Sequence, residues 1–237
     1  MPRMEALAVN ASDWEWAEIG RQLDAEGYAM LPGLLSAEVA RSLARQVAGS
    51  GTARIPLAAC DLGCGQLLYL GADLPEPLGH WRSVLYRHLA VIANRWNAIS
   101  GNAGRYPAEL GEFLLHNRQA GQARPQSYMS RLGAEDYMVL HQRNAGKQVF
   151  PMQIVVLLSE PDCDFQGGEF VMTEQRPRMQ SRPSVLPLRL GDAAVIATAE
   201  RPFKGAKGYY RVNMKHAVSR VRAGERIGLE LSFHEAS

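Results

Sequence analysis

The chain has 237 residues, of which 46% are hydrophobic and 21% charged, a composition typical of one globular domain, alone or with a helical extension. Its formal net charge of +2 is too small to indicate, by itself, a protein dedicated to nucleic acids or membrane surfaces. No segment approaches the roughly 18 apolar residues that cross a bilayer, and residues 1–5 lack the start of a signal peptide, so we expect a cytoplasmic protein without a membrane partner.

The first half of the chain has the apolar periodicity of helices. Ser12 and Glu15 form a capping-box pattern before the first helix, and Gly27 supplies its stop. Over residues 50–80, glycines and prolines favour loops with short strands. The predicted elements are a helix over 13–26, a strand over 28–31, a helix that begins after Ser36, a helix over 83–100 and a helix that opens at Pro107.

Three cysteines, Cys60, Cys64 and Cys163, give neither an even disulfide framework nor two CxxC pairs. We expect them to be small buried apolar side chains in a reducing compartment. A disulfide-rich or zinc-finger protein is therefore not indicated.

The second half changes to short apolar runs separated by Gly, Pro and Asp, which are typical of strands in a sandwich or barrel. The expected strands cover 127–132, 136–141, 150–158, 168–172, 185–190, 193–198, 209–221 and 226–234. Helices followed by strands favour a mainly β fold, a double-stranded β-helix (jelly-roll) barrel that N-terminal helices buttress. We expect one domain over 1–237, with a helical part containing short strands over 1–122 and the jelly-roll core over 123–237.

Two histidines and an arginine are the candidate site residues of the strand-rich half. His141 ends an alternating strand, His216 lies within another strand, and Arg226 follows a turn at Gly224. Iron(II) oxygenases need two neutral imidazoles and one carboxylate on one face, with open positions for a keto acid and O2. The histidines are thus candidate metal ligands that meet across the barrel mouth. Arg226 offers a bidentate fork to a carboxylate inside the barrel.

Ordered motifs carry a resemblance to a known superfamily. Phe-Gln-Gly-Gly-Glu-Phe at 165–170, Leu-Gly-Asp-Ala-Ala-Val-Ile at 190–196 and the segment from His216 to Arg226 resemble the 2-oxoglutarate and iron(II)-dependent oxygenases, in particular their prolyl-hydroxylase-like branch. A closer resemblance, to bacterial oxygenases labelled as acting on alkylated DNA, rests on the segments 93–97, 120–125, 157–161, 173–183 and 208–213.

The resemblance implies the jelly-roll fold and two cofactors, iron(II) and 2-oxoglutarate. It implies that His141 and His216 bind the metal, and that Arg226 binds a carboxylate of 2-oxoglutarate or of the substrate. Two substitutions depart from the superfamily's pattern. Arg143 stands where the aspartate ligand is found, and a guanidinium has no lone pair for a metal. Leu132 stands where related sequences have a tyrosine that lines the 2-oxoglutarate pocket.

These substitutions predict an incomplete triad of His141 and His216, with weak or no iron binding and an altered co-substrate pocket. Asp136 does not restore the triad, because it is an odd number of residues from His141 and faces the other side of a regular strand. Glu169 and Asp192 belong to motifs whose usual roles are structural.

The function that follows is an oxygenase-like enzyme acting on a small acidic molecule, by oxidative or altered chemistry, including metal-independent chemistry. In this interpretation His141, Arg143 and His216 are catalytic, and Arg143, Tyr209 and Tyr210 bind the substrate. Two alternatives stay open: a non-catalytic binding or scaffold protein that keeps the fold, and a nucleic-acid repair dioxygenase.

The repair alternative predicts a basic groove that leads to His141. Arg176, Arg178 and Arg182 lie on one long connection between strands. Their charges fit contact with nucleic acid, or pairing with a neighbouring acid such as Glu174.

Overall fold

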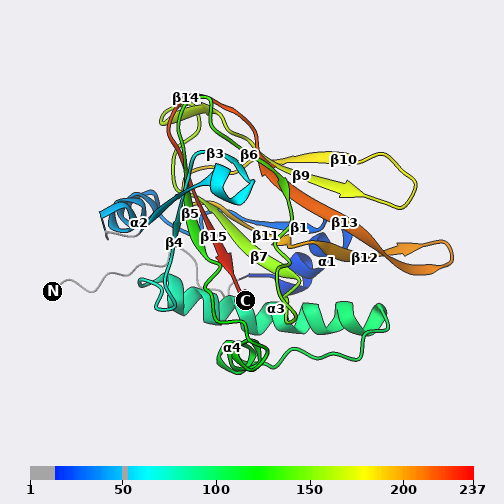
Figure 1. The fold of residues 1–237 in the computed structure, drawn as a ribbon. Coiled ribbons are helices and arrows are strands. Elements are labelled where there is room, and N and C mark those ends of the chain that lie inside the picture. Colours follow the sequence, from blue (N-terminus) through cyan, green and yellow to red (C-terminus); the bar gives the residue numbers. More distant parts are fainter. Residues whose placement is uncertain (1–13, 50–52) are drawn as a thin grey trace.

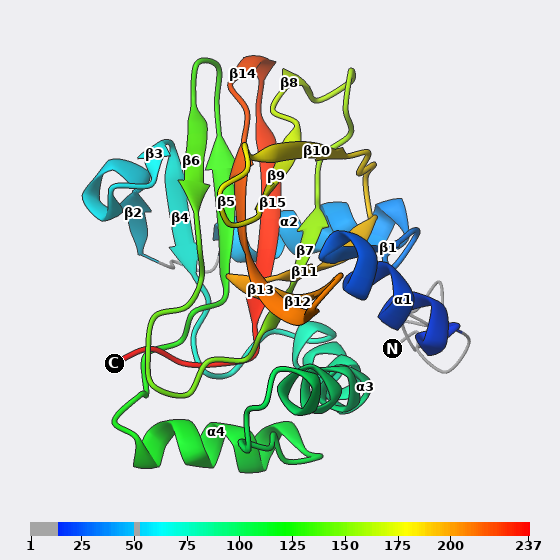
Figure 2. The same ribbon diagram turned by 90° about the vertical axis from the view of Figure 1, so that its right-hand side faces the viewer.

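The computed structural model describes residues 14–49 and 53–237, and two antiparallel sheets dominate them (Figures 1 and 2). The strands are β1 (Tyr28–Leu31), β2 (Arg54–Pro56), β3 (Gly63–Cys64), β4 (Gln66–Tyr69), β5 (Tyr128–Leu132), β6 (Tyr137–His141), β7 (Met152–Leu157), β8 (Phe165–Gly167), β9 (Phe170–Gln175), β10 (Arg182–Leu186), β11 (Ala193–Ala197), β12 (Glu200–Gly205), β13 (Gly208–Val218), β14 (Val221–Gly224) and β15 (Arg226–Ser232). The larger sheet has the order β1-β11-β7-β15-β5-β4-β2, and the smaller has the order β10-β9-β13-β6-β3 with β12 paired to β13.

Helices occupy the first half of the chain, as predicted. They are α1 (Trp16–Glu26), α2 (Ala37–Gly49), α3 (Leu78–Ile99) and α4 (Leu110–Gln119), with a short 3-10 turn, η2 (Leu57–Cys60). Both views show α3 and α4 together below the strands (Figures 1 and 2). Among the described helices, none combines the length and the apolar character needed to cross a bilayer.

The predicted helix ends are partly correct. Gly27, in the left-handed conformation with a φ of 77°, ends α1 as expected, whereas the predicted cap Ser12 lies outside the described residues. Helix α3 begins at Leu78 rather than at 83, because Leu78 extends the buried apolar stripe. Helix α4 begins after Pro107, whose carbonyl accepts a hydrogen bond from the hydroxyl of Tyr86.

The central strands have apolar residues on both faces. Every residue of β7 and β11 is buried, as expected for strands covered on both sides. An aromatic cluster packs α3 and α4 against the ends of β7 and β15. It consists of Tyr86 on α3, Phe113 on α4, Phe150 before β7 and Phe233 after β15, and its ring centres are 5.0 to 5.9 Å apart. This cluster anchors the helices on the sheet that carries part of the site.

Two expectations about individual segments were wrong. Strand β12 was not predicted, because Glu200, Pro202 and Lys204 interrupt any apolar pattern, yet it pairs with β13 along its whole length as a hairpin. The three cysteines are free and exposed instead of buried.

Arg201, on β12, joins that hairpin to the end of α1. It is 1% exposed, and its guanidinium donates to the carbonyls of Asp24 at 2.6 Å and Ala25 at 2.7 Å and to the Glu174 carboxylate. The last carbonyls of a helix have no intrahelical partner, so the guanidinium satisfies groups that the helix itself leaves unpaired.

Candidate metal centre and carboxylate pocket

Three strands bring two imidazoles and one carboxylate together. His141 ends β6, His216 lies directly opposite it on β13, and Glu230 lies on β15 of the larger sheet. One ligand atom from each of the three residues lies within 4.8 Å of the others, and the imidazole ring centres are 4.2 Å apart. We call these three residues the His-His-Glu cluster.

The imidazole of His141 has the form that a metal requires. Nδ1 of His141 lies 2.9 Å from the carbonyl oxygen of Val139, so a neutral ring donates from Nδ1 and keeps a lone pair on Nε2. Nε2 of His141 and Nδ1 of His216 are buried without a hydrogen-bond partner among the described residues. Burial, and next the charge of His216, lowers the pKa of His141 to about 4. His141 is therefore neutral at physiological pH, as a ligand must be.

The Glu230 carboxylate is ionised and held in place by its neighbours. Burial alone would raise its pKa, but nearby charges, that of His216 foremost, hold the pKa of Glu230 below its usual range. Nε2 of Gln153 donates to Oε2 of Glu230 at 3.0 Å and lies 3.4 Å from Nε2 of His216. Tyr128 is the register partner of Glu230 on β5, and burial and then Glu230 raise the pKa of Tyr128.

Arg143 does not occupy the ligand corner that its position in the sequence suggested. Its Nη2 donates to the carbonyl oxygen of Gln126 at 2.6 Å and to the Gln126 amide oxygen at 3.3 Å. Its guanidinium lies 4.8 Å from the centre of the Tyr128 ring. Nη2 of Arg143 is thus bonded to the protein, while the binding of a substrate anion by this side chain stays a prediction.

Arg226 lies on the same face of β15 as Glu230, because the two are an even number of residues apart. It is buried, and its Nε donates to the carbonyl of Gly168 at 2.8 Å. Burial lowers the pKa of Arg226 to about 10, so the side chain stays charged at neutral pH. A Cβ at Gly228 would lie 2.8 Å from Nη1 of Arg226. The guanidinium therefore extends along the strand toward Glu230 over a residue that has no side chain.

A cavity of about 200 Å³ opens beside Arg226, between Phe165 and Leu188 among other apolar side chains. Leu132 is fully buried and is the register partner of Arg226. It supplies no hydroxyl, as predicted from the sequence, but Tyr128 places one on the same face of β5, at the Glu230 end.

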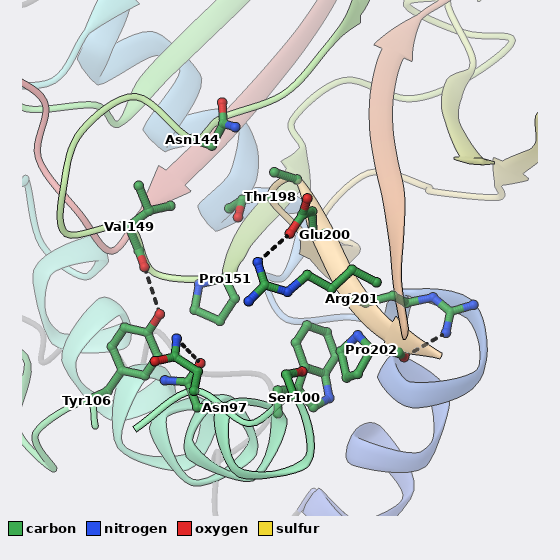
Figure 3. A pocket seen from close by; sticks show the side chains of 14 residues that line it. Asn97, Ser100, Tyr106, Asn144, Val149, Pro151, Thr198, Glu200, Arg201 and Pro202 are labelled. Carbon is green, nitrogen blue, oxygen red and sulfur yellow. Dashed lines mark hydrogen bonds and ion pairs between the residues drawn. The ribbon is translucent and has the colours of Figure 1, made fainter. Parts of the chain in front are cut away.

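A second cavity, of about 360 Å³, lies between the end of α3, the loop over 144–151 and the root of the β12–β13 hairpin (Figure 3). In Figure 3, Asn144, Thr198 and Glu200 lie around it, and the hydroxyl of Tyr106 donates to the carbonyl of Val149 at 2.8 Å. No member of the His-His-Glu cluster lines this cavity.

The structure does not place Tyr209 or Tyr210 beside the histidines. Both lie near the tip of the β12–β13 hairpin, and Tyr210 packs against Phe203 with ring centres 5.3 Å apart. Six residues of strand separate Tyr210 from His216, which is about 20 Å. The two tyrosines therefore do not line the His-His-Glu cluster, and their role in binding a substrate stays a prediction.

Glu230 is the residue that sequence reasoning missed. An acid between Leu229 and Leu231, four residues after Arg226, was a usable signal, because buried charges in apolar strands need partners. With it, the donor set is two imidazoles and one ionised carboxylate, which fits iron(II) and leaves coordination positions open. The expectation of an incomplete triad is corrected by this cluster.

Known proteins resemble the chain in sequence. A family model described as "Oxygenase, catalysing oxidative methylation of damaged DNA" matches residues 65–236. Two uncharacterized proteins of Mycobacterium tuberculosis are each 38% identical to it over 156 residues, which covers 66% of this chain and 67% of theirs.

Solved structures share the fold. A prolyl-4-hydroxylase of Pseudomonas putida has a TM-score of 0.54 at 15% identity, covering 91% of this chain and 96% of its own. An oxidoreductase of the 2OG-Fe(II) oxygenase family from Burkholderia pseudomallei has a TM-score of 0.54 at 18% identity, covering 98% and 97%. A prolyl hydroxylase of Trichoplax adhaerens, in complex with a peptide of hypoxia inducible factor, has a TM-score of 0.54 at 15% identity, covering 93% and 89%. The chain therefore has the mixed α/β, sandwiched-sheet architecture of these oxygenases. Since the family model spans most of its length, the chain belongs to the family described as "Oxygenase, catalysing oxidative methylation of damaged DNA".

Proposed function

We propose that this protein is an iron(II) and 2-oxoglutarate-dependent oxygenase that acts on damaged DNA, with the metal held by His141, His216 and Glu230. The observation that supports the proposal is the His-His-Glu cluster. Its carboxylate, Glu230, lies on the same face of β15 as the buried Arg226. The description of the family is the basis for the substrate class.

This proposal takes up the repair alternative in place of the small acidic substrate. The acidic substrate depended on Arg143 as its receptor and on the loss of the third ligand. Arg143 is bonded to Gln126, and Glu230 provides a carboxylate. These contacts support the repair alternative, and Leu132 remains as a departure from the superfamily's pattern.

Each residue around the cluster has a defined task in this proposal. Nδ1–H of His141 donates to Val139, which orients the ring and leaves Nε2 to bind. Gln153 fixes the Glu230 carboxylate. Arg226 binds the distal carboxylate of 2-oxoglutarate by a charge-assisted contact. Four residues of strand span about 13 Å, and the guanidinium reaching back from Arg226 shortens this gap toward the length of a five-carbon dicarboxylate.

Iron(II) with 2-oxoglutarate supplies oxidation of a substrate C–H bond by O2, while the keto acid loses CO2 and becomes succinate. Oxygenation adds oxygen to carbon, so a methyl group on a damaged base is a substrate for this chemistry. An N-methyl group becomes N-hydroxymethyl, whose C–N bond then breaks to give formaldehyde, with the proton returned to nitrogen.

The metal assignment is tested by anaerobic calorimetric titration of iron(II), or of Mn(II) as a mimic, into the wild type and Glu230→Gln. We expect 1:1 binding by the wild type and affinity at least about 100-fold lower in the variant, because loss of even an outer-shell partner costs 10- to 100-fold. Glu169→Gln makes the same chemical change outside the cluster and should match the wild type. Equal iron(II) affinities of the wild type and Glu230→Gln would show that Glu230 is not a metal ligand.

The substrate class is tested separately with a methylated oligonucleotide, 2-oxoglutarate and O2. Succinate and formaldehyde should form in equal amounts, and unmethylated DNA should give no formaldehyde. A wild type that binds iron and yields neither product from several methylated bases would contradict DNA as the substrate while the metal site stands.

A further inference from the structure

We propose that the β9–β10 and β12–β13 hairpins form a docking surface for the phosphate backbone of DNA, separate from the His-His-Glu cluster. We call it the basic hairpin surface, and its members are Arg178, Arg182, Lys204, Lys207, Tyr209, Arg211 and Lys215. The choice of DNA as the polyanion rests on the proposed function, whereas the surface itself follows from charge and position.

Positive charge is concentrated on these two segments. Residues 175–182 and 204–215 contain seven of the 26 lysines and arginines of the chain and none of its 24 acids. The overall charge of +2 conceals this separation, because the rest of the chain is acidic on balance. A concentrated basic face is the electrostatic footprint of a phosphate-binding protein.

Most of these charges are not neutralised by the protein. Arg176 lies 2.7 Å from Glu174, and exposed Arg211 lies 3.3 Å from exposed Glu200. Within the described part of the chain, no carboxylate lies within ion-pair distance of Arg178, Lys204 or Lys207. Arg182 and Lys215 likewise form no ion pair among the described residues. These cations are exposed and available to an external anion.

The two hairpins project from the end of the smaller sheet at which the cluster lies. His216 pairs with His141, the last residue of β6, so residues 208–215 of β13 continue beyond the end of β6. His216 also pairs with Met172, so the β9–β10 connection over 176–181 projects beyond the same end. Both hairpins extend side by side from the body of the protein (Figures 1 and 2).

One face of the β12–β13 hairpin is free to bind. Alternation along β13 puts Tyr209, Arg211 and Lys215 on one face, and Lys204 of β12 is the register partner of Tyr209. The opposite face is used by the protein, since Val212, Met214 and His216 are buried. Tyr209 is 49% exposed among these cations, and an exposed ring can stack on an unpaired base.

The test measures binding of fluorescent single-stranded and duplex DNA to the full chain by anisotropy, without 2-oxoglutarate or O2, over a salt series. The variant combines Arg178→Glu, Lys204→Glu and Lys207→Glu, all at exposed positions near the hairpin tips. We expect at least tenfold weaker binding. The slope of log affinity against log salt should become shallower by about 2, since each lost phosphate contact contributes roughly 0.7 to 0.9.

A matched control combines Arg45→Glu, Arg54→Glu and Arg105→Glu, three exposed arginines outside the two hairpins. It makes the same change in net charge, so it should bind DNA far more tightly than the hairpin variant. Equal losses in the two triple variants would show a non-specific charge effect and would overturn the proposal. Binding of polyglutamate as tight as that of DNA would assign the surface to acidic proteins and overturn it as well.

The outcomes separate this proposal from the proposed function. DNA binding that depends on the hairpins, in a protein that shows no turnover, would leave the surface standing and reject the enzymatic role. Turnover of methylated DNA that the hairpin variant retains at unchanged DNA affinity would reject the surface and keep the enzyme.

Discussion

The Glu230 carboxylate is buried between two leucines on a central strand, where an unpaired charge costs several kcal/mol. Gln153 donates to it, and His216 and Arg143 contribute positive potential that holds its pKa low. The Glu230 carboxylate is thus a buried negative charge, fixed by its neighbours, that can bind a cation. Its neighbour Arg226 has the opposite charge and an equally buried position, so one strand face offers sites for a cation and for an anion.

At residue scale, Gly228→Ala tests whether the guanidinium needs the space between these two sites. The new Cβ would lie 2.8 Å from Nη1 of Arg226 and 3.1 Å from Oγ of Ser130, so the arginine has to move. We expect affinity for 2-oxoglutarate to fall about tenfold or more, since a hydrogen bond to a charged group contributes roughly 1.5 to 3 kcal/mol, while affinity for Mn(II) stays within a factor of a few.

Calorimetry with Mn(II) and then with 2-oxoglutarate measures both quantities. Gly111→Ala, on α4, adds a Cβ with nothing within 4 Å and should leave both affinities unchanged. Unchanged binding of 2-oxoglutarate by Gly228→Ala would argue against Arg226 as its receptor.

At the scale of elements, the β12–β13 hairpin is fastened to α1 by one fully buried guanidinium. Arg201 reaches two carbonyls in the last turn of the helix and the Glu174 carboxylate on β9. Three elements far apart in sequence therefore share a single side chain. The basic hairpin surface depends on this attachment for a fixed orientation.

Arg201→Leu should lower the free energy of unfolding by about 3 to 5 kcal/mol, because two helix carbonyls and the Glu174 carboxylate each lose a hydrogen bond from a charged group, although Glu174 keeps Arg176. Thermal unfolding should shift by roughly 6 to 20 °C for a chain of this size. Arg211→Leu removes an exposed arginine whose ion pair contributes at most about 1 kcal/mol, and is the control. A shift for Arg201→Leu no larger than that of Arg211→Leu would show that the anchor is dispensable.

At the scale of the whole molecule, buried histidines make stability depend on pH. His234 is 2% exposed, and burial, then the charges of Arg143 and Arg82, lower its pKa to about 3. The folded protein keeps this ring neutral, whereas the unfolded chain protonates it below its ordinary pKa of about 6.5. The neutral ring therefore makes its full contribution to the free energy of unfolding above pH 6.5, and this contribution is lost as the pH falls toward 3.

We expect His234 alone to remove about 2 kcal/mol of stability between pH 6.5 and 5, at 1.36 kcal/mol per pH unit. Urea unfolding over this range should show a shallower slope against pH for His234→Gln than for the wild type. His80→Gln, at an exposed position, should keep the wild-type slope. Identical slopes for all three proteins would contradict the buried neutral ring.

Much of the fold was predictable from local pattern, because helices and buried strands leave a periodic trace. Strand β12 has no such pattern, because charged residues and a proline interrupt it. Its strand conformation depends on pairing with β13 and on the contact of Arg201 with α1. The site was predictable as far as His141, His216 and Arg226, which occur at familiar intervals. Their meeting with Glu230 could not be read from spacing, because it depends on the pairing of β15 with β5 and β7 across the chain.

The position of Glu230 has a consequence for how catalytically silent homologues are sorted. A chain that lacks an acid two places after its first histidine is readily set aside as a pseudoenzyme. Here an acid four places beyond the arginine lies beside the same imidazoles. Such sequences therefore need a structure before they are discarded, because the pairing of strands decides whether a distant acid lies beside the histidines.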